Sequence, residues 1–134
     1  MPLSVITGLE TKQNWTKDMR LIKLPYNKLT YVGLRDVDEF EKKIIKENNI
    51  RQLAVEDILK SMKSMEGPIH ISFDVGALDP SYVSSTGTLV SKGLDPNEVG
   101  EIFDEALNLN KLVSCDVVEF NGDLGEQESS LDSI

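Results

Sequence analysis

The sequence lacks several features that define common protein classes. It contains one cysteine, Cys115, so it can form neither an internal disulfide nor a four-cysteine zinc site. It has no apolar run of about 18 residues and no basic, apolar leader, which predicts a cytoplasmic protein that spans no membrane. Its 14 basic residues face 23 acidic ones, and the resulting net charge of −9 argues against a nucleic-acid partner.

The two ends of the chain differ from its middle. After Lys111 there is no Lys or Arg, and we expect residues 126–134 to form a solvated acidic tail. Asp116 and Glu119 differ from that tail because they stand inside an apolar run. Residues 1–28 show no clear periodicity and are expected to form an irregular surface segment of the single domain that 134 residues suit.

Short apolar runs alternate with helical periods along the rest of the chain, which is typical of an α/β fold. We expect strands near 29–34, 52–55, 69–75 and 112–120, and helices near 37–45, 55–65 and 95–107. Strand–helix–strand connections imply parallel pairing. Three helices can barely cover both faces of such a sheet, and its outer strands would have unpaired edges. The pattern therefore predicts an incomplete fold, in which these strands are part of a larger sheet.

The spacing also predicts the role of individual positions. Asp38 and Glu41 fit a helix capping box, Cys115 is expected to be a small core residue, and His70 is expected to have a structural role. In the first helix, one face is expected to carry Val37, Phe40, Ile44 and Ile45. In the third helix, the expected buried stripe is Val99, Ile102, Phe103, Ala106 and Leu107.

Acidic side chains follow several of the expected strands. Asp36 and Asp38 follow the first, Asp74 ends the strand near 69–75, and Glu119 stands near the end of the last. Ligands of open α/β sheets bind at the carboxyl ends of strands, and grouped carboxylates suit hard metal ions or cationic groups. Each acid also has a local interpretation, as a helix cap, a turn or an exposed strand end.

Four sequence blocks resemble the ureohydrolase superfamily, and arginases in particular. The clearest reads Ser-Phe-Asp-Val-Gly-Ala-Leu-Asp-Pro over residues 72–80, and the others cover residues 31–38, 85–88 and 116–121. The first four residues also resemble a segment of that family. The resemblance implies part of a three-layer α/β/α arginase-like fold with a parallel sheet, over residues 1–134.

The resemblance also implies a function and a set of site residues. Arginases hydrolyse L-arginine to L-ornithine and urea with two Mn ions, which acidify a bridging water. Asp74 matches a metal ligand of that family, Glu119 matches the glutamate that orients the guanidinium group, Asp38 and Glu41 match positions near the α-amino group, and Thr88 matches a threonine lining the site.

The departures from the family pattern bear on activity. The second aspartate of the family motif is Gly76 here, and the histidine-bearing metal motifs that precede it in the family have no counterpart in these 134 residues. Asp74 is then the one matched metal ligand, so we expect the chain by itself to be inactive. The alternatives are a non-catalytic binding or regulatory module, a truncated gene product and an agmatinase-type hydrolase; a complementing chain or a homo-oligomer is a further expectation.

Overall fold

A computed structural model describes residues 6–8 and 23–124 of the chain. It divides into two compact units, Met1–Tyr31 with Val37–Gln52 and Val32–Asp36 with Leu53–Ile134. The expected acidic tail and most of the expected irregular segment lie outside the described residues. No helix in the described part of the chain has the length and apolar character needed to cross a membrane.

The first unit contains the short elements at the start of the chain. A 3₁₀ turn, η2 (Tyr26–Lys28), leads into β1 (Thr30–Val32), and α2 (Glu39–Glu47) leads to β2 (Arg51–Leu53). β1 and β2 form a two-stranded sheet of their own, and the last residue of each strand belongs to the second unit.

Helix α2 begins where the capping box predicts. The Asp38 carboxylate accepts from the Glu41 amide at 2.7 Å, and Glu41 accepts from the Asp38 amide at 3.2 Å. Of the expected apolar stripe, Ile45 is buried, whereas Phe40 is 69% exposed. Helical spacing places Phe40 on the expected apolar face, but no described neighbour covers it.

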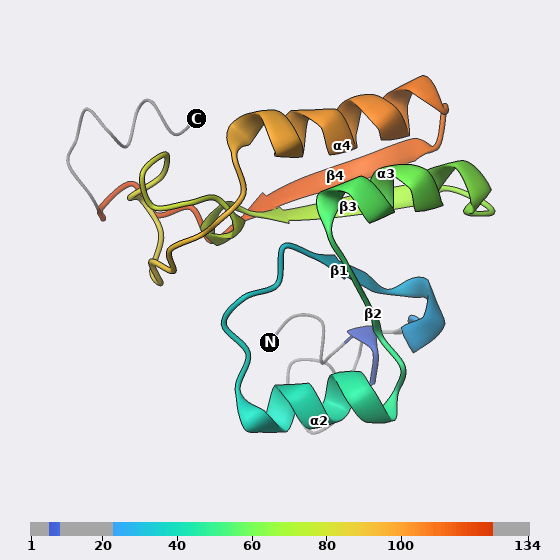
Figure 1. Ribbon diagram of the computed structural model, residues 1–134, viewed down its shortest axis with the longest axis horizontal. Helices are drawn as coiled ribbons and strands as arrows, with labels where there is room; N and C mark the ends of the chain where they lie inside the picture. The colour runs from blue at the N-terminus through green and yellow to red at the C-terminus, as the bar shows by residue number, and fades with distance from the viewer. Residues whose placement is uncertain (1–5, 9–22, 125–134) are drawn as a thin grey trace, which may run out of the picture. The chain divides into compact units, whose positions relative to one another are not determined.

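The second unit is a parallel strand pair with two helices on one side (Figure 1). It runs α3 (Val55–Ser64), β3 (Ile69–Asp74), the 3₁₀ turn η3 (Val75–Ala77), α4 (Pro96–Asn108) and β4 (Leu112–Val118). β3 and β4 pair in parallel, with Ile71 opposite Cys115 and Asp74 opposite Val118. The α/β class and the parallel pairing are confirmed, but the described strands form two separate pairs.

The core of the second unit lies between its helices and β3. Val55, Ile58 and Met62 of α3 pack with Ile102 and Ala106 of α4, and all five are buried. Burying an aliphatic side chain of this size contributes roughly 1.5–3 kcal/mol. Alternate residues of β3 are half-buried and exposed, as the expected two-residue period requires.

Two expected core residues of the second unit are exposed. Leu107 of α4 is 55% exposed, at the outer limit of the expected stripe. Cys115 is exposed because β4 is covered on neither face over most of its length, so the prediction of a core cysteine was wrong. An apolar run marks a strand but does not show whether anything covers it.

Both helices of the second unit have charged end groups. Asp95 and Glu98 form the expected capping box of α4, with Pro96 at its start. At the other end of α3, the Lys111 ammonium group donates to the carbonyls of Met62 at 2.6 Å and Met65 at 2.7 Å. A cation placed at a helix C-terminus satisfies carbonyls that have no partner within the helix.

Candidate functional site

Asp74 lies at the carboxyl end of β3, where it closes a tight turn. Its Oδ1 accepts from the Gly76 amide at 2.8 Å, so the carboxylate caps η3 and has its second oxygen left over. A Cβ added to Gly76 would lie 3.0 Å from this Oδ1 and 3.5 Å from the Thr86 hydroxyl. A side chain at position 76 would therefore project toward the Asp74 carboxylate.

Arg35 joins the turn after β3 to the loop that follows it. Its guanidinium group donates to the carbonyls of Ala77 at 2.5 Å, Gly76 at 2.8 Å and Val90 at 3.0 Å. Three bonds from one planar cation hold two separate backbone segments at a fixed spacing. Arg35 therefore has a positioning role that spacing alone did not predict.

Asp79 fixes the two ends of the same loop. Its carboxylate accepts from the Ser81 amide at 3.0 Å, the Ser81 hydroxyl at 2.8 Å and the Gly93 amide at 3.0 Å. These bonds, those from Ser81 first, lower the pKa of Asp79 from 3.8 to about 2. A Cβ on Gly93 would lie 2.1 Å from the Asp79 amide nitrogen, so only glycine fits there.

Glu119 follows β4 directly, at the same end of the sheet as Asp74. Since Asp74 pairs with Val118, Glu119 lies one residue beyond that pair. Glu119 has φ +63°, a left-handed conformation that costs a residue with a side chain roughly 1–2 kcal/mol. Within the described residues no hydrogen bond or ion pair engages its carboxylate, which is exposed.

The segment that carries Thr88 is attached beside Glu119. Thr86 and Phe120 form an antiparallel bridge, and the Asn121 amide donates to the Ser85 carbonyl at 2.8 Å. Ser85 and Thr86 are buried, whereas Thr88 is exposed. The structure thus connects the segment of Thr88 to the end of β4, in the same unit as Asp74.

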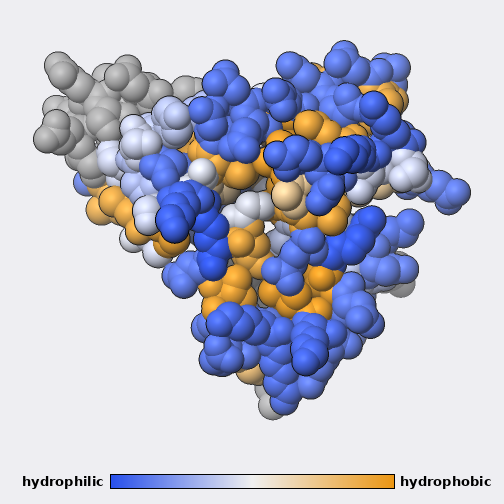
Figure 2. Space-filling model, viewed as in Figure 1, coloured by the Kyte–Doolittle hydropathy of each residue, from blue (hydrophilic) through white to orange (hydrophobic). Residues whose placement is uncertain are grey.

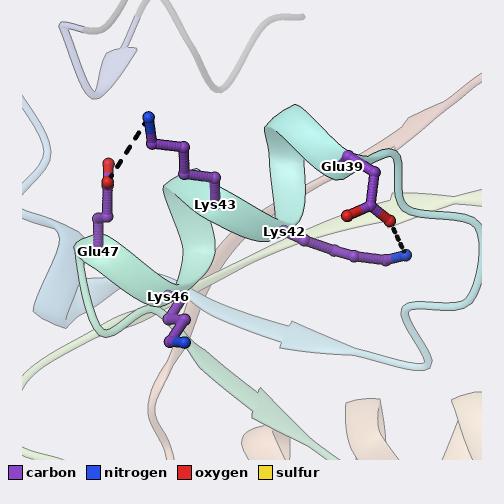
Figure 3. A pocket seen from close by; sticks show the side chains of 5 residues that line it. All are labelled: Glu39, Lys42, Lys43, Lys46 and Glu47. Atoms are coloured by element: carbon purple, nitrogen blue, oxygen red, sulfur yellow. Dashed lines mark hydrogen bonds and ion pairs between the residues drawn. The ribbon is translucent and has the colours of Figure 1, made fainter.

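Asp38 and Glu41 belong to the first unit. Their carboxylates make the capping box of α2, so the local interpretation of both acids holds. Burial and the nearby charge of Glu41 raise the pKa of Tyr31 above 10.0. An exposed groove along α2 is lined by charged side chains only (Figure 3): Lys42 pairs with Glu39 at 2.7 Å, and Lys43 lies 3.8 Å from Glu47.

This groove is an open helix face of mixed charge. Figure 2 shows hydrophilic residues over the α2 segment, and Figure 3 shows Lys46 directed away from the two ion pairs. Exposed ion pairs of this kind are screened by water and contribute roughly 0–1 kcal/mol. No hydrophobic or aromatic residue lines the groove, and it lacks the convergent polar groups of a ligand site.

His70 and Asp116 pair across the middle of the β3–β4 sheet. His70 Nε2 lies 3.2 Å from Asp116 Oδ2, and His70 Nδ1 lies 2.8 Å from the Ser114 hydroxyl. The Ser72 hydroxyl donates to Asp116 Oδ1 at 2.6 Å. These bonds are consistent with a structural role for His70, since they connect neighbouring strands.

The donor groups of the described chain do not fit a pair of metal ions. Among residues 6–8 and 23–124, no cluster of three or more His, Cys, Asp or Glu side chains has the arrangement of a metal site. One oxygen of the Asp74 carboxylate already accepts a hydrogen bond from the Gly76 amide, and glycine at position 76 supplies no side-chain oxygen. An oxygen-ligated divalent ion needs about six ligands, so most would have to be water.

Comparison with known proteins identifies the family. A family model described as the arginase family matches residues 13–132. The arginase of Neurospora crassa is 40% identical over 137 residues, covering 90% of this chain and 38% of that protein. The arginase of Glaciozyma antarctica is 37% identical over 149 residues, which cover 99% of this chain and 43% of that protein. The chain belongs to the arginase family, and it spans about two fifths of the length of these relatives.

Solved structures agree with this assignment. Entamoeba histolytica arginase in complex with L-ornithine matches 99% of this chain and 50% of its own, with a TM-score of 0.79 and 28% identity. Bacillus caldovelox arginase matches 99% of this chain and 49% of its own, with a TM-score of 0.82 and 25% identity. An agmatine ureohydrolase of Thermoplasma volcanium has a TM-score of 0.64 and 23% identity, so this match shows only a shared fold.

Proposed function

We propose that these 134 residues are the later portion of an arginase-type guanidino hydrolase, and that by themselves they neither hold a manganese pair nor hydrolyse L-arginine. The absence of a carboxylate at Gly76 carries the second part of the proposal. In this assignment Asp74 is one metal ligand, Glu119 orients the guanidinium group, and Thr88 lines the site. Asp38 and Glu41 recognise the substrate's α-amino group.

The ligand count supports the expectation of inactivity. A two-metal site needs bridging groups that hold the ions about 3.5–4 Å apart. Asp74 offers one oxygen beyond the one bonded to Gly76. A single exposed carboxylate cannot exclude water from an ion or hold two ions at that distance, so the chain alone lacks the means to activate a water molecule.

The state of Glu119 supports its substrate role. A carboxylate can accept two parallel hydrogen bonds from a guanidinium group, and no described residue competes for this one. Its left-handed backbone is the kind of local strain that recurs at functional sites. Glycine would relieve that strain but would supply no carboxylate.

The proposal is tested by measuring Mn binding and urea release on the purified chain. We expect no stoichiometric Mn uptake by calorimetry and no urea from L-arginine, with Neurospora crassa arginase as the positive control. Gly76→Asp alone should also release no urea, because the histidine motifs remain absent. Mn-dependent turnover by the unmodified chain would overturn the proposal.

A second candidate, a non-catalytic module that binds a guanidino compound, is favoured by the same free Glu119 carboxylate. Titration of isotope-labelled protein with L-arginine, without Mn, would then shift NMR signals around Glu119 and Thr88, and Glu119→Gln would abolish the shifts. Agmatine lacks the α-carboxylate of arginine, so comparing the two ligands separates the arginase-type from the agmatinase-type assignment. Unchanged spectra with both ligands would exclude this candidate.

A further inference from the structure

Arg35 binds three backbone carbonyls with the two outer nitrogens of its guanidinium group. Nη2 donates to the carbonyls of Gly76 at 2.8 Å and Val90 at 3.0 Å, and Nη1 donates to that of Ala77. We call these three groups the carbonyl cradle; they lie 41 to 55 positions beyond Arg35 in the chain. Among residues 6–8 and 23–124 no carboxylate pairs with Arg35, so the cradle is what holds its charge.

The cradle is suited to the shape of a guanidinium group. Arg35 Nε is buried and has no hydrogen-bond partner in the described part of the chain, so all three bonds come from the outer edge of the group. There, two nitrogens in one rigid plane donate to separate carbonyls. A lysine side chain ends in one compact ammonium group on a flexible stem. Lysine at position 35 would therefore keep the charge but not the geometry.

On one side, the cradle fixes the turn that holds Asp74. The Gly76 amide donates to Asp74 Oδ1, and the Gly76 carbonyl accepts from Arg35. The peptide units before and after Gly76 are thus both held by side chains, which matters because glycine restricts its own backbone less than any other residue. Arg35 therefore helps to set the direction of the Asp74 carboxylate through one intervening residue.

On the other side, the cradle holds the loop that carries Thr88. Thr88 is exposed and lies two residues before Val90, whose carbonyl accepts from Arg35, and two residues after Thr86, which bridges to Phe120. The loop is thus anchored on both sides of Thr88, once at the end of β4 and once at Arg35. The second anchor is the one that joins this loop to the turn after β3.

We propose that Arg35 is a positioning residue that holds the Asp74 turn and the Thr88 loop at a fixed spacing, through a cradle that accepts a guanidinium group in preference to an ammonium group. The inference rests on the proposed function only in treating Asp74 and Thr88 as site residues. Every bond that it uses lies within the second unit, so it requires no partner chain.

Removal of Arg35 tests the cradle. The amides of Leu94 and Asp79 join the two ends of the loop, and the Leu94 amide shares the Ala77 carbonyl with Arg35. In Arg35→Ala we expect hydrogen exchange at these two amides, measured by NMR, to become roughly 10- to 100-fold faster, with exchange in α3 and α4 unchanged. Arg35→Lys should resemble Arg35→Ala. The matched control Arg51→Ala, at an exposed arginine of β2, should resemble the parent.

Free guanidinium supplies a second readout. At a concentration well below that which unfolds the parent, it should fill the empty cradle of Arg35→Ala and return exchange at Leu94 toward the parent rate. The NMR signals of Thr88 should shift in Arg35→Ala and return on the same titration, although Thr88 lies two residues from the cradle. Methylammonium at equal concentration should restore neither, and guanidinium should leave Arg51→Ala unchanged.

Three results would overturn the proposal: parent-like exchange in Arg35→Lys, faster exchange in α3 and α4 by the same factor as in the loop, or no rescue by guanidinium. If Arg35→Ala does not fold alone, guanidinium should restore its folding, and the comparison of Arg35→Lys with the parent still decides. Urea release by the purified chain would instead overturn the proposed function and leave these measurements unaffected.

Discussion

Restoring a carboxylate at position 76 gives the sharpest test of the missing-ligand argument. Gly76 does not have the left-handed backbone that requires glycine, and a Cβ there would lie 3.0 Å from Asp74 Oδ1. Contact at this distance requires Asp74 to move by a few tenths of an ångström. Gly76→Asp therefore folds, but it sets two carboxylates side by side at the end of β3.

The expected cost is mainly electrostatic. Two unit charges about 4 Å apart repel by roughly 1 kcal/mol in water and roughly 4 kcal/mol at an effective dielectric constant of 20. Asp74 is exposed, which places the penalty near the lower value, at about 1–2 kcal/mol of unfolding free energy. A divalent cation bound between the carboxylates removes this penalty, and protonation in acid removes it too.

The measurement is urea unfolding followed by circular dichroism, with and without Mn. We expect Gly76→Asp to be less stable than Gly76→Asn, which adds the same bulk without the charge, and to regain about 1 kcal/mol when Mn exceeds its dissociation constant about five-fold. The unmodified chain and Gly76→Asn should not respond to Mn. Equal stability of both variants, or an equal response to Mn, would refute the argument that position 76 faces Asp74.

Three further predictions concern polar residues of the second unit. Lys111→Met removes the cation at the end of α3 and should cost about 1–2 kcal/mol in urea unfolding, whereas Lys60→Met, whose ion pair is exposed, should cost well under 1 kcal/mol. Asp79→Asn should have a lower unfolding free energy than the parent at pH 7. Because the folded-state pKa of Asp79 is lowered to about 2, this difference should persist above pH 4 and disappear as the pH falls toward 2. A difference that does not change with pH would contradict this cause. Glu119→Gly should have an unfolding free energy about 0.5–1 kcal/mol higher than that of Glu119→Ala, because glycine adopts the left-handed backbone conformation without strain and alanine does not.

Local signals in the sequence predicted the elements well. Asp38 with Glu41 and Asp95 with Glu98 form the two capping boxes that their spacing indicates, since a cap depends on four consecutive residues. The two-residue period of β3 was equally reliable, because one face of that strand packs on helices within the same unit.

Predictions that depended on a neighbour were less successful. Phe40, Leu107 and Cys115 have apolar character but are exposed, because periodicity does not show whether a partner surface is present. Arg35 and Lys111 donate to backbone carbonyl groups more than 40 positions away in the chain. Every residue has such a carbonyl, so the sequence does not show which one accepts the hydrogen bond. Long-range backbone contacts of this kind were beyond any spacing argument.

The local and functional interpretations of the candidate acids are compatible, because a carboxylate has two oxygens. Asp38 and Asp74 each give one oxygen to a backbone amide two or three residues ahead, at 2.7 Å and 2.8 Å. That bond fixes the carboxylate in one orientation and leaves the other oxygen for a ligand, so a cap can pre-orient a binding group. Glu119 has no such bond, and its direction is set by its left-handed backbone instead. Replacement of either aspartate by asparagine keeps one acceptor oxygen for the cap and removes the charge, so it distinguishes binding from folding at each position.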